Sequence, residues 1–357
     1  MEEKKSRKRN PFLIIFFILI GSTLILCTTV LGLWLHGRSS MNQPISVPTL
    51  PSHDQQANTL SSNTIIEYQG KRYQYNESMH NILLMGIDSN KTAAEAAGDH
   101  DQSDVLVLAA LNQDAGKMTL ISISRDTMCD IQVLDWNGNP DYLMHTQLAL
   151  SYAYGDGQHQ SCQMTRDAVS NLFYGLPIHG YGSFYLEGIS ALNDAVGGVT
   201  VTILDDYPFT AIPGGSQMHA GLEKTLTGRE ARIYIQARPE TGLDSNHLRM
   251  QRQKQYMLSL ISRAKQLIQQ NPVSILNIYT AVDDYILTDL DLGEISYLAT
   301  LAAGMDFSGD LRSVQGNLVL SEDNFAELHV DETALYELML DVFYTEIPHS
   351  LSDSPNP

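Results

Sequence analysis

The chain has 357 residues, 43% of them hydrophobic, and 41 acidic residues against 22 basic ones give a formal net charge of −19. A hydrophobic fraction of this size can build a sizeable core, so disorder over the whole length is excluded. The acidity argues against nucleic acid as a partner, because a phosphate backbone attracts basic surfaces. Any anion-binding site must be built locally from the few arginines.

The N-terminus has the pattern of a retained membrane anchor. The first ten residues, MEEKKSRKRN, carry five Lys or Arg, and the 23 residues 13–35 carry no charge. As a helix this run would span about 34 Å, more than the roughly 30 Å hydrocarbon core of a bilayer, and no cleavage pattern follows it closely. The positive-inside tendency predicts a cytoplasmic basic tail at 1–12, a single pass through the cell membrane at 13–35, and everything later outside.

The external part divides into a linker, a domain and a tail. Residues 36–63 are rich in Ser, Pro, Gln and Asn and predict a flexible extracellular stalk. Residues 64–346 are predicted to form one domain, and residues 347–357 a disordered tail. Outside the anchor the cysteines are Cys129 and Cys162. An oxidising exterior permits a disulfide between them, but two cysteines do not decide whether it forms.

The apolar runs 105–111 and 118–124 predict a hairpin at the centre of the domain's sheet. Asp104 precedes the first run, and Arg125 and Asp126 follow the second. The start of one antiparallel strand and the end of the next lie at the same edge, so these three charges should be neighbours in space. Charged side chains at one edge of a buried sheet indicate a functional site.

The rest of the domain alternates between strand and helix patterns and contains no internal repeat. A capping box at Thr227 and Glu230 is predicted to open one helix. The alternation favours a single α/β domain, a three-layer α/β/α arrangement around a central mixed sheet. The other predicted strands are a short hairpin at 65–76 that turns at Gly70, and 82–87, 199–204 and 311–320. The other predicted helices are 147–154, 162–174, 184–196, 248–269, 275–279, 292–303 and 331–343.

Two carboxylates are candidates for a metal site. Asp88 ends one predicted strand and Asp104 begins another. Mg²⁺ is usually held by one or two carboxylates together with substrate phosphates, so this pair suits it. The alternative is that both residues only cap strand ends in solvent, as Asp commonly does.

Arginines gather in two segments of this acidic chain. Arg125 follows a buried strand, while Arg238, Arg249 and Arg252 lie where a loop enters the long helix predicted at 248–269. Guanidinium groups match pairs of phosphate oxygens, which indicates a phosphate site. Surface ion pairs are the alternative reading. No serine-hydrolase elbow, zinc-protease motif or Walker loop occurs.

Five ordered blocks carry a resemblance: NILLMGID, QSDVLVLAALN, KMTLISISRDT, LNDAVGGVTV, and LTGREARIYIQAR followed by LRMQRQ. Across residues 81–316 the chain resembles the LytR-CpsA-Psr family of cell-wall glycopolymer ligases. The resemblance implies an apolar pocket for a polyprenyl chain beside a polar mouth that holds pyrophosphate and Mg²⁺. It also implies transfer of a glycopolymer, such as teichoic acid or capsular polysaccharide, from its lipid carrier to a hydroxyl of peptidoglycan.

The family's site residues can be carried over where this sequence matches its motifs. The resemblance places the Mg²⁺ ligands on Asp88 and Asp104. The family's Ser-Ile-Pro-Arg-Asp-Thr motif is matched from Ser122 to Thr127, with Ser124 replacing proline. The implied pyrophosphate-binding residues are Arg125, Arg238, Arg249, Arg252 and Gln253.

The match departs from the family pattern at two arginine positions. Gln102 and Gln236 stand there, and both stay in the predicted pyrophosphate site of what would be a variant subgroup. The acidic residue three before the helix arginine corresponds to Asn246, unless a two-residue shift in the loop brings Asp244 into its place. Fewer guanidinium groups weaken a phosphate clamp, since each charge-assisted contact contributes about 1.5–3 kcal/mol.

The predicted activity is a Mg²⁺-dependent phosphotransferase that joins a polyprenyl-linked glycopolymer to peptidoglycan outside the membrane. Arg125 would stabilise the developing charge, and Asp126 or Asp244 would take the proton from the acceptor hydroxyl. Apolar elements between residues 105 and 192 would line the acyl pocket. The alternatives are a regulatory wall protein that binds the lipid without catalysis, and a lipid pyrophosphatase.

Overall fold

The computed structural model describes residues 29, 31–43, 47–50, 65–206, 218–237, 245–307 and 311–348, without the side chains of 245–247. The predicted tail 1–12, most of the predicted anchor and nearly all of the predicted C-terminal tail lie outside the described residues. Arg238 and Asp244 lie outside them as well. Within these ranges no helix has the length and apolar character needed to cross a membrane.

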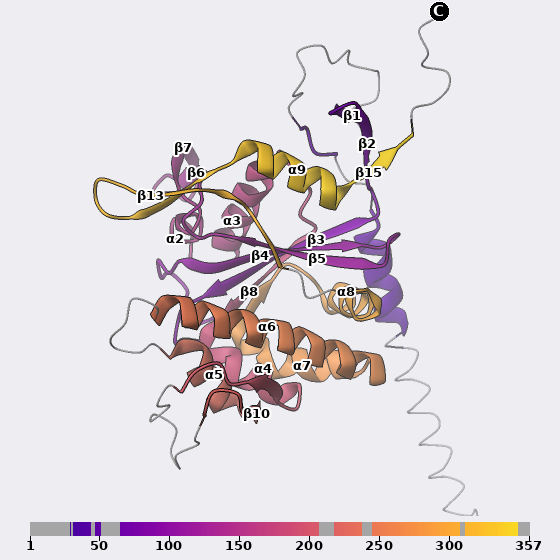
Figure 1. The fold of residues 1–357 in the computed structure, drawn as a ribbon, viewed down its shortest axis with the longest axis vertical. Helices are drawn as coiled ribbons and strands as arrows, with labels where there is room; N and C mark the ends of the chain where they lie inside the picture. The colour runs from indigo at the N-terminus through magenta and orange to yellow at the C-terminus, as the bar shows by residue number, and fades with distance from the viewer. Residues whose placement is uncertain are drawn as a thin grey trace, which may run out of the picture.

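A six-stranded mixed sheet forms the centre of the molecule. Its strands run in the order β11-β8-β3-β4-β5-β12 (Figure 1). Neighbours β3, β4 and β5 are antiparallel, whereas β8 pairs parallel with β3 and β12 parallel with β5. The mixed sheet predicted from the sequence is confirmed. The strands are β3 Met79–Ile87, β4 Ser103–Asn112, β5 Lys117–Ile123, β8 Gly180–Tyr185, β11 Ile286–Thr288 and β12 Leu311–Ser313.

The strand register brings four strand ends to one edge of this sheet. Ile87, the last residue of β3, pairs with Tyr185 at the end of β8 and with Ser103 at the start of β4. Ile123, which ends β5, pairs with Leu106 of β4. We call this side the charged edge, because Asp88, Asp104, Arg125, Asp126 and Glu187 follow or flank these strand ends.

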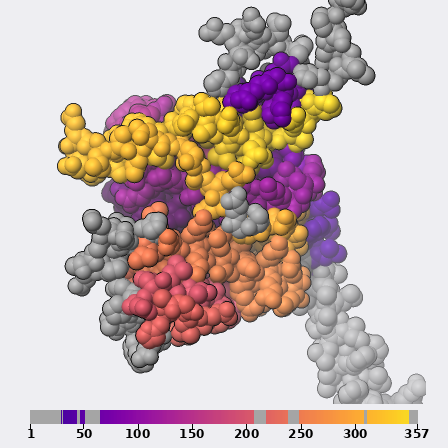
Figure 2. Space-filling view, in the orientation of Figure 1, coloured from indigo at the N-terminus to yellow at the C-terminus, as the bar shows by residue number. Residues whose placement is uncertain are grey.

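Helices cover both faces of the sheet. One face packs Leu83, Leu108 and Ile121 into a core with α3 (His159–Leu172) and α9 (Glu332–Phe343). The opposite face packs against α6 (Ser245–Gln270) and α8 (Leu292–Gly304). Figures 1 and 2 show the yellow α9 on one side of the sheet and the orange α6 on the other, so the structure has three layers.

A smaller group of elements packs against the far side of α6 around its own apolar core. The Thr227–Glu230 capping box is confirmed at the start of α5, because each side chain accepts a hydrogen bond from the other residue's backbone N–H. The helix predicted at 184–196 begins later, because β8 continues to Tyr185 and a 3₁₀ turn, η1 (Leu186–Gly188), follows. The group comprises α4 Ile189–Ala195, β9 Val199–Thr202, β10 Glu223–Leu226, α5 Gly228–Gln236 and α7 Ser274–Val282.

The segment 31–41 is a helix that packs on α8, at the end of the sheet opposite the charged edge. A Cβ atom on Gly37 would lie 2.1 Å from the carbonyl oxygen of Gly293, so the two backbones touch through their glycines. Trp34 packs edge-on against Tyr297 with 5.7 Å between ring centroids, and the Ser40 hydroxyl donates to Glu294 over 2.5 Å. The flexible stalk expected from residue 36 therefore differs from the structure over 36–43, because Gly37 and Ser40 fit the α8 surface. Residues 31–35, the last part of the predicted anchor, belong to the same helix, and Trp34 packs on the domain as well.

The remaining strands form hairpins and one small sheet outside the central sheet. The helix predicted at 147–154 is reduced to α2 (Leu150–Ala153), because β7 runs as far as Gln147. The predicted strand 311–320 is divided between β12 and β13. The other elements are β1 Ile65–Tyr68, β2 Lys71–Tyr75, β6 Met128–Leu134, β7 Pro140–Gln147, η2 Asp283–Tyr285, β13 Gly316–Leu320, β14 Ala326–Val330 and β15 Tyr344–Ile347.

Cys129 on β6 and Cys162 on α3 are both buried, and both thiols are free. The disulfide that the sequence allowed is therefore not formed in this structure. Burial raises the pKa of each thiol to about 12, which leaves both protonated at neutral pH and poorly nucleophilic. Both cysteines act as small apolar side chains of the core.

Candidate functional site

Arg125 is the centre of the ion pairs at the charged edge. Its Nη1 donates to Oδ1 of Asp104, and its Nε lies 3.5 Å from Oδ1 of Asp126. The contact across the hairpin confirms the prediction that these three charges are neighbours. Asp126 also accepts a hydrogen bond of 3.4 Å from the amide of Gln147 on β7. The guanidinium thus holds two carboxylates in place while its side chain stays 46% exposed.

Asp88 and Asp104, the two carboxylates predicted to bind magnesium, both lie at the charged edge. Asp88 follows β3 directly and is exposed, and the pairing of Ile87 with Ser103 brings Gln102 and Asp104 alongside it. Nearby, Oδ2 of Asp101 is buried and accepts no hydrogen bond from the described residues. Within the described ranges, no group of three or more His, Cys, Asp or Glu side chains could hold a metal by itself. Two carboxylates are nevertheless enough for Mg²⁺, which takes its other ligands from water and substrate phosphates.

The predicted site residues on α5 and α6 have different surroundings. Gln253 donates its amide to the carbonyl of Ile235 over 3.2 Å and so ties α6 to the end of α5. Gln236 and Arg249 are both partly buried. The Gln253 contact brings the C-terminal end of α5 and the N-terminal part of α6 together.

Arg252 has a structural environment rather than a ligand-facing one. Its side chain is fully buried, and its Nη1 lies 3.4 Å from Oδ2 of Asp205. Its Nη2 donates to the carbonyl of Ala237, and its guanidinium carbon lies 5.7 Å from the centroid of the Tyr234 ring. Arg252 therefore joins α6, the end of α5 and the segment after β9.

Arg232 on α5 is a second arginine at the charged edge, and sequence reasoning missed it. Its Nη1 lies 2.6 Å from Oε2 of Glu187, which follows β8, and its Nη2 donates over 2.6 Å to Oδ1 of Asn90, which follows β3. Its Nε donates over 3.2 Å to the Gln236 amide oxygen. The one available signal was the four-residue spacing between Arg232 and Gln236, which places both on one helix face.

An apolar surface borders the charged edge. Leu84 in β3 is 44% exposed although β3 is an interior strand of a covered sheet, and Val105 of β4 is exposed beside it. Both lie on the face that carries Val107 and turns toward α6. Gly86 and Gly182 flank them on neighbouring strand positions and add no side chain to the surface. The helical layer is thus open above Leu84, next to the ion pairs.

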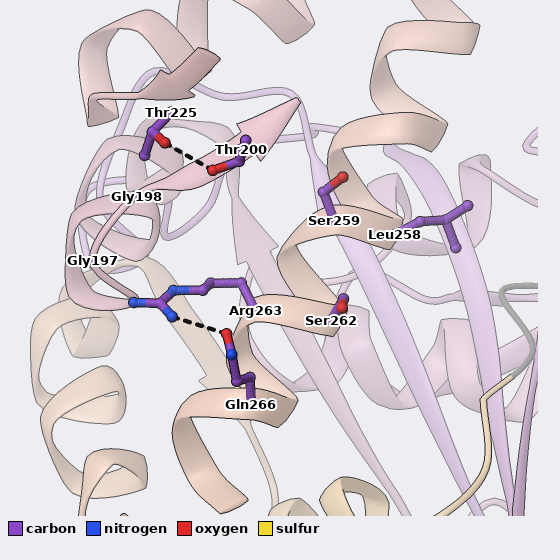
Figure 3. A pocket seen from close by; sticks show the side chains of 9 residues that line it. All are labelled: Gly197, Gly198, Thr200, Thr225, Leu258, Ser259, Ser262, Arg263 and Gln266. Carbon is purple, nitrogen blue, oxygen red and sulfur yellow. Dashed lines mark hydrogen bonds between the residues drawn. The ribbon is translucent and has the colours of Figure 1, made fainter. Parts of the chain in front are cut away.

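A pocket of about 550 Å³ lies elsewhere, between the β9–β10 hairpin and the C-terminal half of α6 (Figure 3). The side chains that line it are mostly polar, with Thr200 and Thr225 hydrogen-bonded to each other over 2.8 Å and Arg263 donating to Gln266 over 3.1 Å. This pocket lies outside residues 105–192 and is not the predicted acyl pocket. Most apolar side chains of 105–192 are packed in the core instead, and the exposed apolar side chains beside the charged edge are Leu84 and Val105.

The domain has three α/β layers, and acidic and guanidinium groups lie at one edge of its sheet beside exposed apolar side chains. These features agree with the class of protein that the sequence blocks predict. The chain belongs to the LytR_cpsA_psr family, whose sequence model matches residues 49–335. Over 313 residues, covering 85% of this chain and 84% of the relative, it is 26% identical to a polyisoprenyl-teichoic acid–peptidoglycan teichoic acid transferase TagU of Oceanobacillus iheyensis.

Solved structures share the fold. The crystal structure of B. subtilis TagV matches with a TM-score of 0.55 and 23% identity, covering 74% of this chain and 96% of TagV. The structure of TagT bound to LI-WTA matches with a TM-score of 0.54 and 19% identity, covering 74% of this chain and 89% of TagT.

Proposed function

We propose that this protein transfers a glycopolymer from a polyprenyl diphosphate carrier to peptidoglycan. The observation that carries the proposal is the apposition of Arg125, Asp88 and Asp104 with the exposed Leu84 and Val105 on the same sheet. A lipid diphosphate needs both parts: an apolar surface for its tail, where each buried CH₂ contributes about 0.8 kcal/mol, and a charged mouth for its head. The family and the TagU relative support this substrate class.

Asp88 and Asp104 would hold Mg²⁺, which when bound neutralises diphosphate charge and polarises the reacting phosphorus. Arg125, already fixed by Asp104 and Asp126, donates its remaining N–H groups to the phosphoryl oxygens and stabilises the charge that develops on them. These groups need no rearrangement at the moment of reaction, because the ion pairs already fix the guanidinium.

Asp126 is the general base that the described geometry favours, since its carboxylate lies at the mouth beside Arg125. It takes the proton of the acceptor hydroxyl as that oxygen bonds to the sugar-linked phosphorus. The bond from this phosphorus to the bridging oxygen breaks, and the lipid leaves as its monophosphate. Asp244 is the second candidate base, proposed from the sequence alone.

The membrane topology remains part of the proposal and rests on the sequence. A basic tail at 1–12 and an uncharged run at 13–35 support a single-pass anchor with the domain outside the cell membrane. An external domain would meet both peptidoglycan and the finished glycopolymer there.

The decisive experiment incubates the full-length chain in detergent with a radiolabelled polyprenyl diphosphate oligosaccharide. We expect label to join peptidoglycan oligomers only when these oligomers and Mg²⁺ are present, and EDTA to stop the reaction. Binding of the lipid without any transfer would favour a regulatory wall protein. Release of phosphate without an acceptor would favour a lipid pyrophosphatase.

A further inference from the structure

Arg232 is a guanidinium group at the charged edge that no motif of the sequence assigns. It rises from α5, and its partners Asn90 and Glu187 stand just beyond the ends of the parallel strands β3 and β8. Asn90 is two residues after the proposed magnesium ligand Asp88. The Arg232 head therefore lies beside the loop that presents Asp88, on the opposite side of β3 from β4 and Asp104.

The side chain of Arg232 is held in one orientation yet reaches solvent. Asn90, Glu187 and Gln236 each engage a different nitrogen of the guanidinium. An arginine head has five N–H donors, so these three contacts leave two N–H groups for a ligand. The side chain is 26% exposed, which lets an anion at the mouth approach it. A guanidinium fixed in advance loses little conformational freedom on binding.

The hydrogen bond between Arg232 and Gln236 shows that the two side-chain heads are neighbours. Nε of Arg232 lies 3.2 Å from Oε1 of Gln236, so the guanidinium reaches the head of the side chain one helical turn further on. Position 236 is where the resemblance to the family predicts an arginine and this chain has glutamine. A positive charge supplied from 232 is thus present directly beside the head of the side chain at 236.

We propose that Arg232 binds the diphosphate of the lipid substrate and replaces the guanidinium absent from position 236. This inference rests on the proposed function and deepens it, because it names a further substrate-binding residue. Arg125 and Arg232 would then contact the diphosphate from two sides of the Asp88 loop. Glu187 and Asn90 act as positioning residues that aim the guanidinium.

The test measures binding of farnesyl diphosphate with Mg²⁺ to the full-length chain, with farnesol as a probe that lacks the diphosphate. We expect Arg232→Gln to weaken farnesyl diphosphate binding by about tenfold to a hundredfold, the usual range for one charge-assisted contact. Farnesol binding should not change. The exchange Arg232→Gln with Gln236→Arg should restore most of the affinity, because it returns a guanidinium to the adjacent position on the same helix face.

The matched control is Arg166→Gln on α3, an arginine that is 30% exposed and also contacts carboxylates, at 3.0 Å (Asp167) and 3.5 Å (Asp289). It should bind both probes like the unmodified chain. Unchanged farnesyl diphosphate affinity in Arg232→Gln would overturn the inference while leaving the proposed function standing. Equal loss of both probes, or no recovery in the exchanged variant, would also overturn it. Failure of the unmodified chain to bind farnesyl diphosphate would instead refute the proposed function.

Discussion

Replacing Arg125 with alanine is expected to lower the rate of glycopolymer transfer by about a hundredfold to a thousandfold, the usual cost of removing one preorganised donor from a charged transition state. The effect should be this large because Arg125 contacts both Asp104, a proposed metal ligand, and Asp126, the proposed base. Its loss removes a phosphate contact and leaves two carboxylates without their counter-charge. The initial rate of label transfer to peptidoglycan oligomers measures the effect.

Arg312→Ala provides the matched control for Arg125→Ala. Arg312 is 43% exposed and pairs with Asp341 over 3.1 Å, so it resembles Arg125 in exposure and in having a carboxylate partner. Its loss should leave transfer unchanged, as expected for a surface ion pair. The transfer rate of Arg125→Lys should lie between those of Arg125→Ala and the unmodified chain, because lysine keeps the charge but lacks the planar guanidinium. An unchanged transfer rate in Arg125→Ala would show that Arg125 does not stabilise the phosphoryl charge.

Replacing Arg252 with methionine is expected to destabilise the domain by about 3 kcal/mol, because removing one member of a buried ion pair leaves the other uncompensated. Methionine retains the length and apolar contact of the side chain but cannot bond to the Ala237 carbonyl or pair with Asp205. The midpoint of urea denaturation, followed by tryptophan fluorescence, measures the loss.

Lys254→Met on the same helix is the control, since Lys254 is exposed and exposed substitutions usually change stability by less than about 0.5 kcal/mol. The predicted structural role of Arg252 would be contradicted if Arg252→Met kept its denaturation midpoint and lost farnesyl diphosphate binding. Arg252 would then be a phosphate ligand, as the sequence alone predicts, rather than a structural residue.

The sequence predicted the parts of the fold whose patterns are local. The central hairpin was found because its two apolar runs are long and joined by a clear turn, and the position of Arg125 beside Asp104 followed from antiparallel geometry. The cap at Thr227 was found because it depends on residues three apart. The sequence predicts the start of α4 too early, because residues 184–188 fit a helix pattern although they form the end of β8 and a 3₁₀ turn.

The site was predicted only in part, because burial and partners are set by tertiary structure. Arg252 and Arg249 looked equivalent as helix arginines, yet Arg252 turns inward to Asp205 and the Tyr234 ring. Arg232 was missed because nothing near it in sequence reveals that Asn90 and Glu187 meet it at the ends of two strands. Packing of residues 31–43 on α8 could not be foreseen, because 31–35 resemble the end of an apolar anchor and 36–43 a polar linker, whereas the packing depends on the paired glycines Gly37 and Gly293.

The most direct measurement is a crystal structure of the full-length chain with Mg²⁺ and a polyprenyl diphosphate oligosaccharide. It should show the metal on Asp88 and Asp104, the diphosphate against Arg125 and Arg232, and the prenyl chain over Leu84 and Val105. A diphosphate bound away from the charged edge, for example at Arg263 in the polar pocket beside α6, with the surface at Leu84 left uncovered, would contradict the central claim.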